Sequence, residues 1–259
     1  GRRVESAPLT CVNGRYEMDF EALENAAKKP DAKLFLLCSP HNPVGRVWTR
    51  AELEKVCDIC AQNGVIVASD EIHADLVLKG EHIPFLNVSP KAREISLIFV
   101  AASKTFNVPG LQLASVIAPD AGIRARFHDA ELAAGLENMS YFGHAASIAA
   151  YTQGADWLDA AIDYIRGNYE CLRDFLKERL PALKVADLEG TYLAWIDCRA
   201  LGLDDKALAA FARQKARLIL GEGVNFGAEG SGFLRWNLAV PRHCLMEGLE
   251  RLDAAIRAL

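Results

Sequence analysis

Three short, uninterrupted runs of apolar residues stand out in the first half of the chain. They occupy residues 34–38, 65–68 and 97–101, and polar residues follow each run. An amphipathic helical pattern fills residues 50–62, with a capping box formed by Thr49 and Glu52 before it and the stop signal Asn63-Gly64 after it. Strands that are apolar at every position are typical of a parallel sheet with helices on both faces. We therefore predict an α/β fold.

The second half of the chain has a different pattern. Helical periodicity covers residues 121–138, 145–151 and 155–180, and Pro181 closes the last of these. Short strands are predicted at 192–196, 217–220 and 233–237, followed by a helix over 242–259. We interpret residues 159–259 as a smaller α+β domain and residues 1–158 as a larger, incomplete domain.

The composition excludes several classes of protein. Hydrophobic residues make up 51% of the chain and charged residues 24%, which suits a folded core and excludes a disordered chain. A net charge of −5 argues against non-specific nucleic-acid binding. No apolar run approaches the roughly 18 residues that a membrane span needs. We predict a protein that binds neither nucleic acid nor membrane.

The seven cysteines are scattered and odd in number, which is typical of buried thiols in a reducing cytoplasm. The Cys-x-x-Cys pair, Cys57 and Cys60, lies in an amphipathic helix and has no second pair. Core packing is therefore favoured over a zinc site, and a redox role is the weaker alternative. No histidine stands at a metal-ligand spacing, so we predict no metal site.

Residues that could take part in catalysis or binding follow the ends of the three apolar runs. Asn42 follows the first run, Asp70 and His73 follow the second, and Lys104 follows the third. Ligands of open parallel sheets bind at the carboxyl ends of the strands. A lysine beside an apolar run, in a site with a fixed carboxylate, suits imine chemistry because burial lowers the pKa of an amine. On spacing alone, a solvated loop lysine and a helix-capping Asp70 explain the same residues equally well.

Four segments carry a resemblance to a known family. They are Ser-Pro-His-Asn-Pro-Val-Gly at 39–45, Ser-Asp-Glu-Ile-His at 69–73, Ser-Lys-Thr-Phe-Asn-Val-Pro-Gly-Leu at 103–111 and Phe-Leu-Arg-Trp-Asn-Leu-Ala at 233–239. In this order they resemble the fold-type-I pyridoxal-phosphate enzymes of the class I/II aminotransferase family. His73 and the Glu-Gly-Thr-Tyr-Leu-Ala-Trp stretch at 189–195 are most similar to the MalY/PatB-type cystathionine β-lyases.

The resemblance implies roles around a pyridoxal 5'-phosphate cofactor. Lys104 would bind the cofactor through its amine and later carry the Cα proton. Asp70 would keep the pyridine nitrogen protonated. Asn42 would donate a hydrogen bond to the phenolic oxygen of the ring, and His73 stands where many aminotransferases carry a tyrosine for that oxygen. Ser103 would offer its hydroxyl to the phosphate.

The resemblance also places the substrate. Arg235 would hold the α-carboxylate in a bidentate pair, with a surface ion pair as the alternative reading of this arginine. His41 lies in the first motif and would contact the substrate. Two positions depart from the family pattern: Gln112 stands where many relatives carry a phosphate-binding arginine, and Ala101 where a serine is common.

The resemblance implies a C–S β-lyase that acts on an amino acid, with transamination as the alternative. The family's sites are typically built at a homodimer interface, so a homodimer is implied as well. The chain begins after the family's N-terminal portion, which carries a phosphate-binding loop and a stacking aromatic residue. We therefore expect the 259-residue chain alone to bind cofactor weakly. A hypothesis of another class follows, namely an inactive fragment or a regulatory or binding module.

Overall fold

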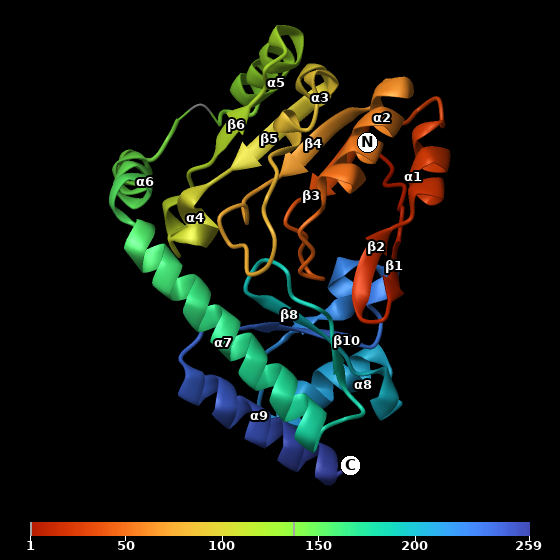
Figure 1. The fold of residues 1–259 in the computed structure, drawn as a ribbon, viewed down its shortest axis with the longest axis vertical. Coiled ribbons are helices and arrows are strands. Elements are labelled where there is room, and N and C mark those ends of the chain that lie inside the picture. The colour runs from red at the N-terminus through yellow and green to blue at the C-terminus, as the bar shows by residue number, and fades with distance from the viewer. Residues whose placement is uncertain (1, 137) are drawn as a thin grey trace.

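Two four-stranded sheets and one β-hairpin form the frame of the protein (Figure 1). They are seen in a computed structural model that describes residues 2–136 and 138–259. The first sheet and its helices come from the first half of the chain, and the second sheet is built from residues after 183. The long helix α7 (Ala155–Arg179) runs from the neighbourhood of the first sheet to the second (Figure 1).

The first sheet has the strand order β3-β4-β5-β6. Its strands are β3 (Leu34–Cys38), β4 (Ile66–Asp70), β5 (Ser96–Val100) and β6 (Ser115–Ile117). The first three are parallel, and β6 pairs antiparallel with β5. The three predicted strands are confirmed, with bounds shifted by two residues at most, while β6 was not predicted.

One face of this sheet is covered by the helices α1 (Phe20–Ala27), α2 (Arg50–Gln62) and α3 (Pro90–Ile95). The predicted capping box at the start of α2 and its end at Asn63 are confirmed. Cys57 and Cys60 are buried in this core as free thiols, as the helical pattern predicted.

The expectation that helices cover both faces is wrong at β3. Leu36 lies on the opposite face of the sheet and is 74% exposed. The helix α5 (Ala121–Ala133) reaches this face at β5, where Phe127 meets Phe99 edge-on with ring centroids 6.1 Å apart. Within the described residues, Leu34 and Leu36 of β3 therefore stay exposed on this face.

The second sheet is antiparallel and has the strand order β7-β8-β10-β9. Its strands are β7 (Lys184–Val185), β8 (Leu193–Asp197), β9 (Gly221–Glu222) and β10 (Phe233–Asn237). The predictions of β8 and β10 are confirmed. The predicted strand over 217–220 is wrong because Arg217 adopts a left-handed φ of 55°, which turns the chain before pairing starts at Gly221.

The helices α7, α8 (Asp205–Ala210) and α9 (Arg242–Arg257) cover one face of this sheet. A short π-helical turn, Phe211–Lys215, continues α8. Leu234 and Trp236 of β10 point into this core, whereas Arg235 lies opposite Trp195 of β8 on the other face. That second face is the one available to a functional site.

Two helices and the β-hairpin complete the fold. The helix α4 (Ala102–Thr105) directly follows β5, and α6 (Tyr141–Gln153) precedes α7. The predicted helix over 121–138 ends at Ala133, and residue 137 within that range lies outside the described residues. The hairpin of β1 (Leu9–Val12) and β2 (Arg15–Met18) extends toward the second sheet (Figure 1).

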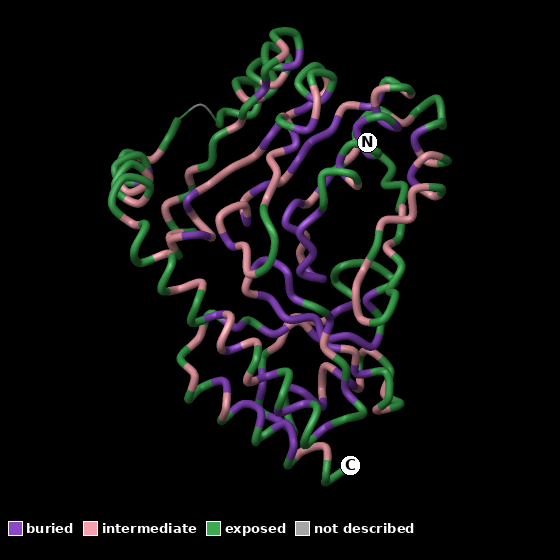
Figure 2. Tube along the Cα trace, viewed as in Figure 1, coloured by how far each residue is buried: buried purple, intermediate pink, exposed green. Residues whose placement is uncertain are grey.

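Burial follows this arrangement. Buried backbone concentrates in the strands and in the helix faces that meet them, while α5 and α6 are largely exposed along their length (Figure 2). Within the described residues, no helix combines the length and apolar character needed to cross a membrane.

Candidate active site

Three segments at the carboxyl ends of neighbouring parallel strands hold the candidate residues. Asn42 lies in the loop after β3, Asp70 is the last residue of β4, and Lys104 lies in α4 directly after β5. The half-buried Lys104 makes no hydrogen bond or ion pair with another described residue. The strand order β3-β4-β5 brings these residues to one edge of the sheet, as the sequence predicted.

Asp70 and its neighbour Glu71 have separate surroundings. One oxygen of Asp70 accepts a hydrogen bond from the Ile72 N–H at 3.2 Å. Glu71 is buried and accepts hydrogen bonds of 2.9 Å from the Ser69 hydroxyl and the Phe85 N–H, with His82 Nε2 also at 2.9 Å. Glu71 therefore anchors the turn after β4 while the Asp70 carboxylate keeps capacity for another partner.

His73 is buried beside two positive charges. Burial, together with the charges of Lys104 and Arg235, lowers the pKa of His73 from 6.5 to about 4. Its ring meets Tyr192 edge-on, with centroids 5.7 Å apart. Its Nδ1 has no hydrogen-bond partner among the described residues. The lowered pKa therefore favours a neutral imidazole near the lysine and the arginine, with a polar atom that has no partner among the described residues.

Arg235 connects the second sheet to the loop after β3. Its Nη1 donates a hydrogen bond of 2.8 Å to the Asn42 Oδ1, across 193 residues of sequence. Its guanidinium lies 4.6 Å from the centroid of the Phe226 ring. Burial lowers the pKa of Arg235, and no carboxylate pairs with it in the part of the chain that the structure describes. The alternative reading of Arg235 as a surface ion pair is therefore wrong.

Two further predicted residues, His41 and Ser103, are the chain neighbours of Asn42 and Lys104. His41 packs edge-on against Trp48, with ring centroids 5.7 Å apart, and burial followed by the charge of Arg46 lowers its pKa to about 4. Among the described residues, its ring makes no hydrogen bond or ion pair with Lys104 or Arg235. Ser103 precedes Lys104 in α4 and is half-buried. The structure thus joins Asn42 to Arg235 by a hydrogen bond and brings His73 within the influence of the Lys104 and Arg235 charges.

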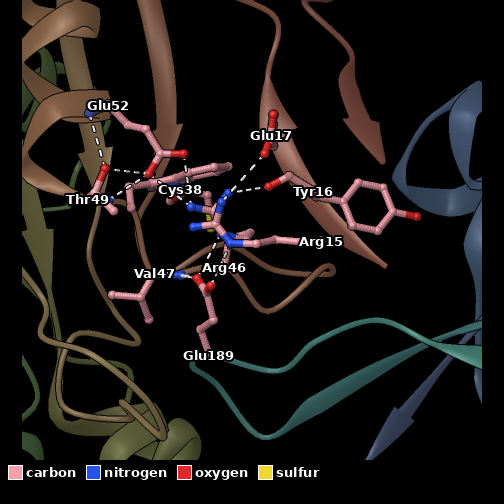
Figure 3. A network of polar contacts seen from close by, with 10 residues as sticks. Arg15, Tyr16, Glu17, Cys38, Arg46, Val47, Thr49, Glu52 and Glu189 are labelled. Atoms are coloured by element: carbon pink, nitrogen blue, oxygen red, sulfur yellow. Dashed lines mark hydrogen bonds and ion pairs between the residues drawn. The ribbon is translucent and has the colours of Figure 1, made fainter. Parts of the chain in front are cut away.

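A buried ionic network that the sequence did not predict lies next to this site (Figure 3). Arg46 is fully buried, and its Nε donates to Glu189 Oε2 at 2.7 Å. Its Nη2 donates to both oxygens of Glu52 at 2.9 Å, and its Nη1 donates to the Tyr16 carbonyl. Arg46 and Glu189 are 143 residues apart, so no local pattern could pair them.

Glu189 stays ionised within this network. Burial alone would raise its pKa, but a hydrogen bond from the Val47 N–H and the guanidinium groups of Arg46 and Arg15 lower it overall. The Val47 N–H lies 3.0 Å from Oε2, and Arg15 Nε lies 3.0 Å from Oε1. Each Glu189 oxygen therefore accepts from a positively charged donor.

Comparison with known proteins places this site in a family. The family model for aminotransferase class I and II matches residues 2–252. Cystathionine beta-lyase PatB of Bacillus subtilis is 41% identical over 257 residues, which cover 99% of this chain and 66% of PatB. Protein MalY of Escherichia coli is also 41% identical, over 93% of this chain and 62% of MalY.

A solved structure gives the same result. The crystal structure of cystalysin from Treponema denticola, which contains a pyridoxal 5'-phosphate cofactor, aligns with a TM-score of 0.95 and 39% identity. The alignment covers 97% of this chain and 64% of cystalysin. The chain therefore spans about two thirds of the length of these relatives.

Proposed function

This chain belongs to the aminotransferase class I and II family. From that premise, we propose that it functions as a pyridoxal 5'-phosphate-dependent C–S β-lyase. The enzyme would cleave a sulfur-containing amino acid with water into a thiol, pyruvate and ammonia. One observation carries the proposal: Lys104, Asp70 and Asn42 share one edge of the sheet, and Arg235 reaches the same edge from the second sheet.

The residues at this edge fit the cofactor. It needs an amine for its aldehyde, a carboxylate for its pyridine nitrogen and donors for its phenolic oxygen. Lys104, Asp70 and Asn42 supply these three groups in the proposed assignment. The buried His73 Nδ1, which has no hydrogen-bond partner in the described residues, is a further group that a bound molecule would satisfy. Ser103, next to Lys104, would offer its hydroxyl to the phosphate.

The chain's own residues would act as follows. Arg235 would bind the α-carboxylate and orient the Cα–H bond, and Lys104 Nζ would take the Cα proton. Asp70 would hold a proton on the pyridine nitrogen. When bound, the cofactor supplies an electron sink for the negative charge left at Cα. The β-thiolate would then leave, and addition of water to the remaining three-carbon fragment would give pyruvate and ammonia. No net oxidation or reduction is involved.

We also propose the domain organisation, the cellular location and the oligomeric state of the protein. We assign cofactor binding to residues 1–158 and the smaller domain to 159–259, and we propose a cytoplasmic homodimer. Free thiols at all seven cysteines support the cytoplasm. Tyr141 and Phe142 of α6 are 92% and 80% exposed, which supports an interface on that helix. His41 remains a proposed substrate contact through its place beside Asn42.

Transamination is the second candidate function. The description of the matched family names aminotransferases, and both reactions begin with removal of the same Cα proton. A binding module without catalysis is the alternative from another class. The three functions differ in what they release from a sulfur amino acid, so one experiment separates them.

The protein should be incubated with cystathionine and with enough pyridoxal 5'-phosphate to offset the weak cofactor binding expected of this chain, with no keto acid added. We expect pyruvate and free thiol to appear together, and both to vanish in Lys104→Ala. Lys91→Ala, which changes an exposed lysine of α3, is the control. Borohydride reduction followed by peptide mapping should place a pyridoxyl adduct on Lys104. Product that forms only with an added keto acid would favour transamination, and absence of an adduct on Lys104 would refute both enzymatic proposals.

A further inference from the structure

The segment 188–191 attaches both candidate-site loops to the second sheet. The N–H groups of Glu189 and Gly190 donate to the Gly45 carbonyl at 2.8 and 2.9 Å, which secures the loop after β3. The Glu189 carbonyl accepts from Leu78 and Lys79 at 2.8 and 2.9 Å, which secures the loop after β4. The same segment then continues into β8. One short stretch therefore holds the two loops and the second sheet in contact.

The backbones in this contact approach too closely for side chains. A Cβ atom on Gly190 would lie 2.8 Å from Val47 Cγ2 and 3.1 Å from Pro40 Cβ. A Cβ atom on Gly45, whose φ is 74°, would overlap Leu188 Cδ1. The loop after β3 and the segment 188–191 therefore fit against each other with little freedom to slide.

The ion pair of Arg46 and Glu189 crosses this contact. Arg46 is held on its other side by Glu52, at the start of α2 (Figure 3). Its own loop is closed by hydrogen bonds from the His41 N–H to the Arg46 carbonyl at 2.7 Å and from the Gly45 N–H to the His41 carbonyl at 2.8 Å. A displacement of Arg46 would therefore also move Asn42, which lies inside that turn.

These contacts close a ring through the candidate site. Arg46 leads through its turn to Asn42, and Asn42 is bonded to Arg235 of β10. Arg235 is paired with Trp195 of β8, and β8 leads back to Glu189. We propose that Arg46 and Glu189 are positioning residues that set the distance between Asn42 and Arg235, and hence the fit of the substrate α-carboxylate. This inference rests on the carboxylate-binding role of Arg235 in the proposed function.

Glu189→Gln is the informative variant because it removes the charge and keeps the shape and one acceptor oxygen. Asp253→Asn is the matched control. The Asp253 carboxylate is also buried and also bound by two arginines, Arg179 and Arg257, but it joins α7 to α9 within the helical layer. Both variants should lower the melting temperature, because each removes one buried carboxylate partner from two arginines.

Only Glu189→Gln should weaken carboxylate binding. We expect the KM for the amino acid to rise about tenfold, since small displacements of a binding group have effects of that order or more. Alanine, which has no β-leaving group, binds without being cleaved, and its binding can be followed by the change in the cofactor absorption band. Its dissociation constant should rise by the same factor as KM. That band should itself persist in the free enzyme, because Lys104 lies outside the network. Asp253→Asn should leave KM and this dissociation constant unchanged.

A double-mutant cycle with Arg235→Lys tests the positioning role of Glu189 separately from the proposed role of Arg235. If Glu189 acts through Arg235, Glu189→Gln should have little further effect on KM in the Arg235→Lys background. Equal effects in both backgrounds, or the same rise of KM in Asp253→Asn, would overturn the positioning role. An unchanged KM in Arg235→Lys alone would instead overturn the proposed role of Arg235. Should Glu189→Gln fail to fold, Arg46→Lys gives the same cycle with the positive charge kept.

Discussion

Protonation of His73 should make the cofactor-free protein unstable in mild acid. The pKa of His73 is lowered from 6.5 to about 4 by its burial and by the charges of Lys104 and Arg235. Between these two values the unfolded chain binds a proton at this histidine and the folded protein does not. The free energy of unfolding therefore rises with pH across this window and is lost as the pH falls from 6.5 toward 4.

The size of the loss follows from the two pKa values. A group with a pKa of 6.5 in the unfolded chain and about 4 in the folded protein lowers the free energy of unfolding by about 2 kcal/mol between pH 7 and pH 5. His41, whose pKa is also lowered to about 4, should contribute a similar amount. The wild-type protein should thus lose about 4 kcal/mol from these two groups over this range.

Urea unfolding at pH 7 and pH 5, followed by circular dichroism, measures this loss. His73→Gln should remove about half of the pH-dependent loss from the two histidines. The exposed His128 of α5 supplies the control, because His128→Gln should leave the difference between the two pH values as it is in the wild type. An unchanged pH dependence in His73→Gln would refute the conclusion that His73 is neutral in the folded protein.

Two further predictions concern the loop after β3 and the helix that follows it. Gly45→Ala should lower the free energy of unfolding by more than the roughly 1–2 kcal/mol of a left-handed backbone, because its Cβ also meets Leu188. Gly64→Ala, with a φ of 65° and open space around the Cβ position, should show the backbone cost alone, and equal urea midpoints for the two variants would contradict the Leu188 contact. Thr49→Ala should lower the free energy of unfolding by about 1 kcal/mol through loss of the capping box, and an unchanged midpoint would refute that contribution.

The sequence predicted those helices and strands in which apolar and polar residues follow a regular pattern. The apolar run at Leu34–Cys38 and the capped helix Arg50–Gln62 match the structure residue for residue. An uninterrupted apolar run and a helix with one apolar face are both local signals, so local sequence suffices for both, although only one face of β3 is covered by described residues. The ends of these strands also sufficed to bring Asn42, Asp70 and Lys104 to one edge.

Other features of the structure were missed or predicted wrongly, each for a physical reason. The hairpin of β1 and β2 was missed although Asn13-Gly14 is a strong signal for a two-residue turn, with φ values of 52° and 84°. The strand expected at 217–220 was an apolar run that serves as a connection after the π-helical turn. The Arg46–Glu189 pair could not be predicted because its partners meet only when the two sheets are brought together.

The two arginines beside the candidate site show what the network contributes to function. Arg46 is fully buried and its charge is matched by two carboxylates, so it has nothing left to offer a ligand. Arg235 contacts a neutral amide and an aromatic face, and the lowered pKa reports a desolvation that no carboxylate offsets among the described residues. A partly buried, uncompensated positive charge is unfavourable for the folded protein alone and favourable for binding an anion. The Arg46 network can keep the two sheets together without drawing a carboxylate toward Arg235, and it thereby leaves that charge for the α-carboxylate that we propose Arg235 binds.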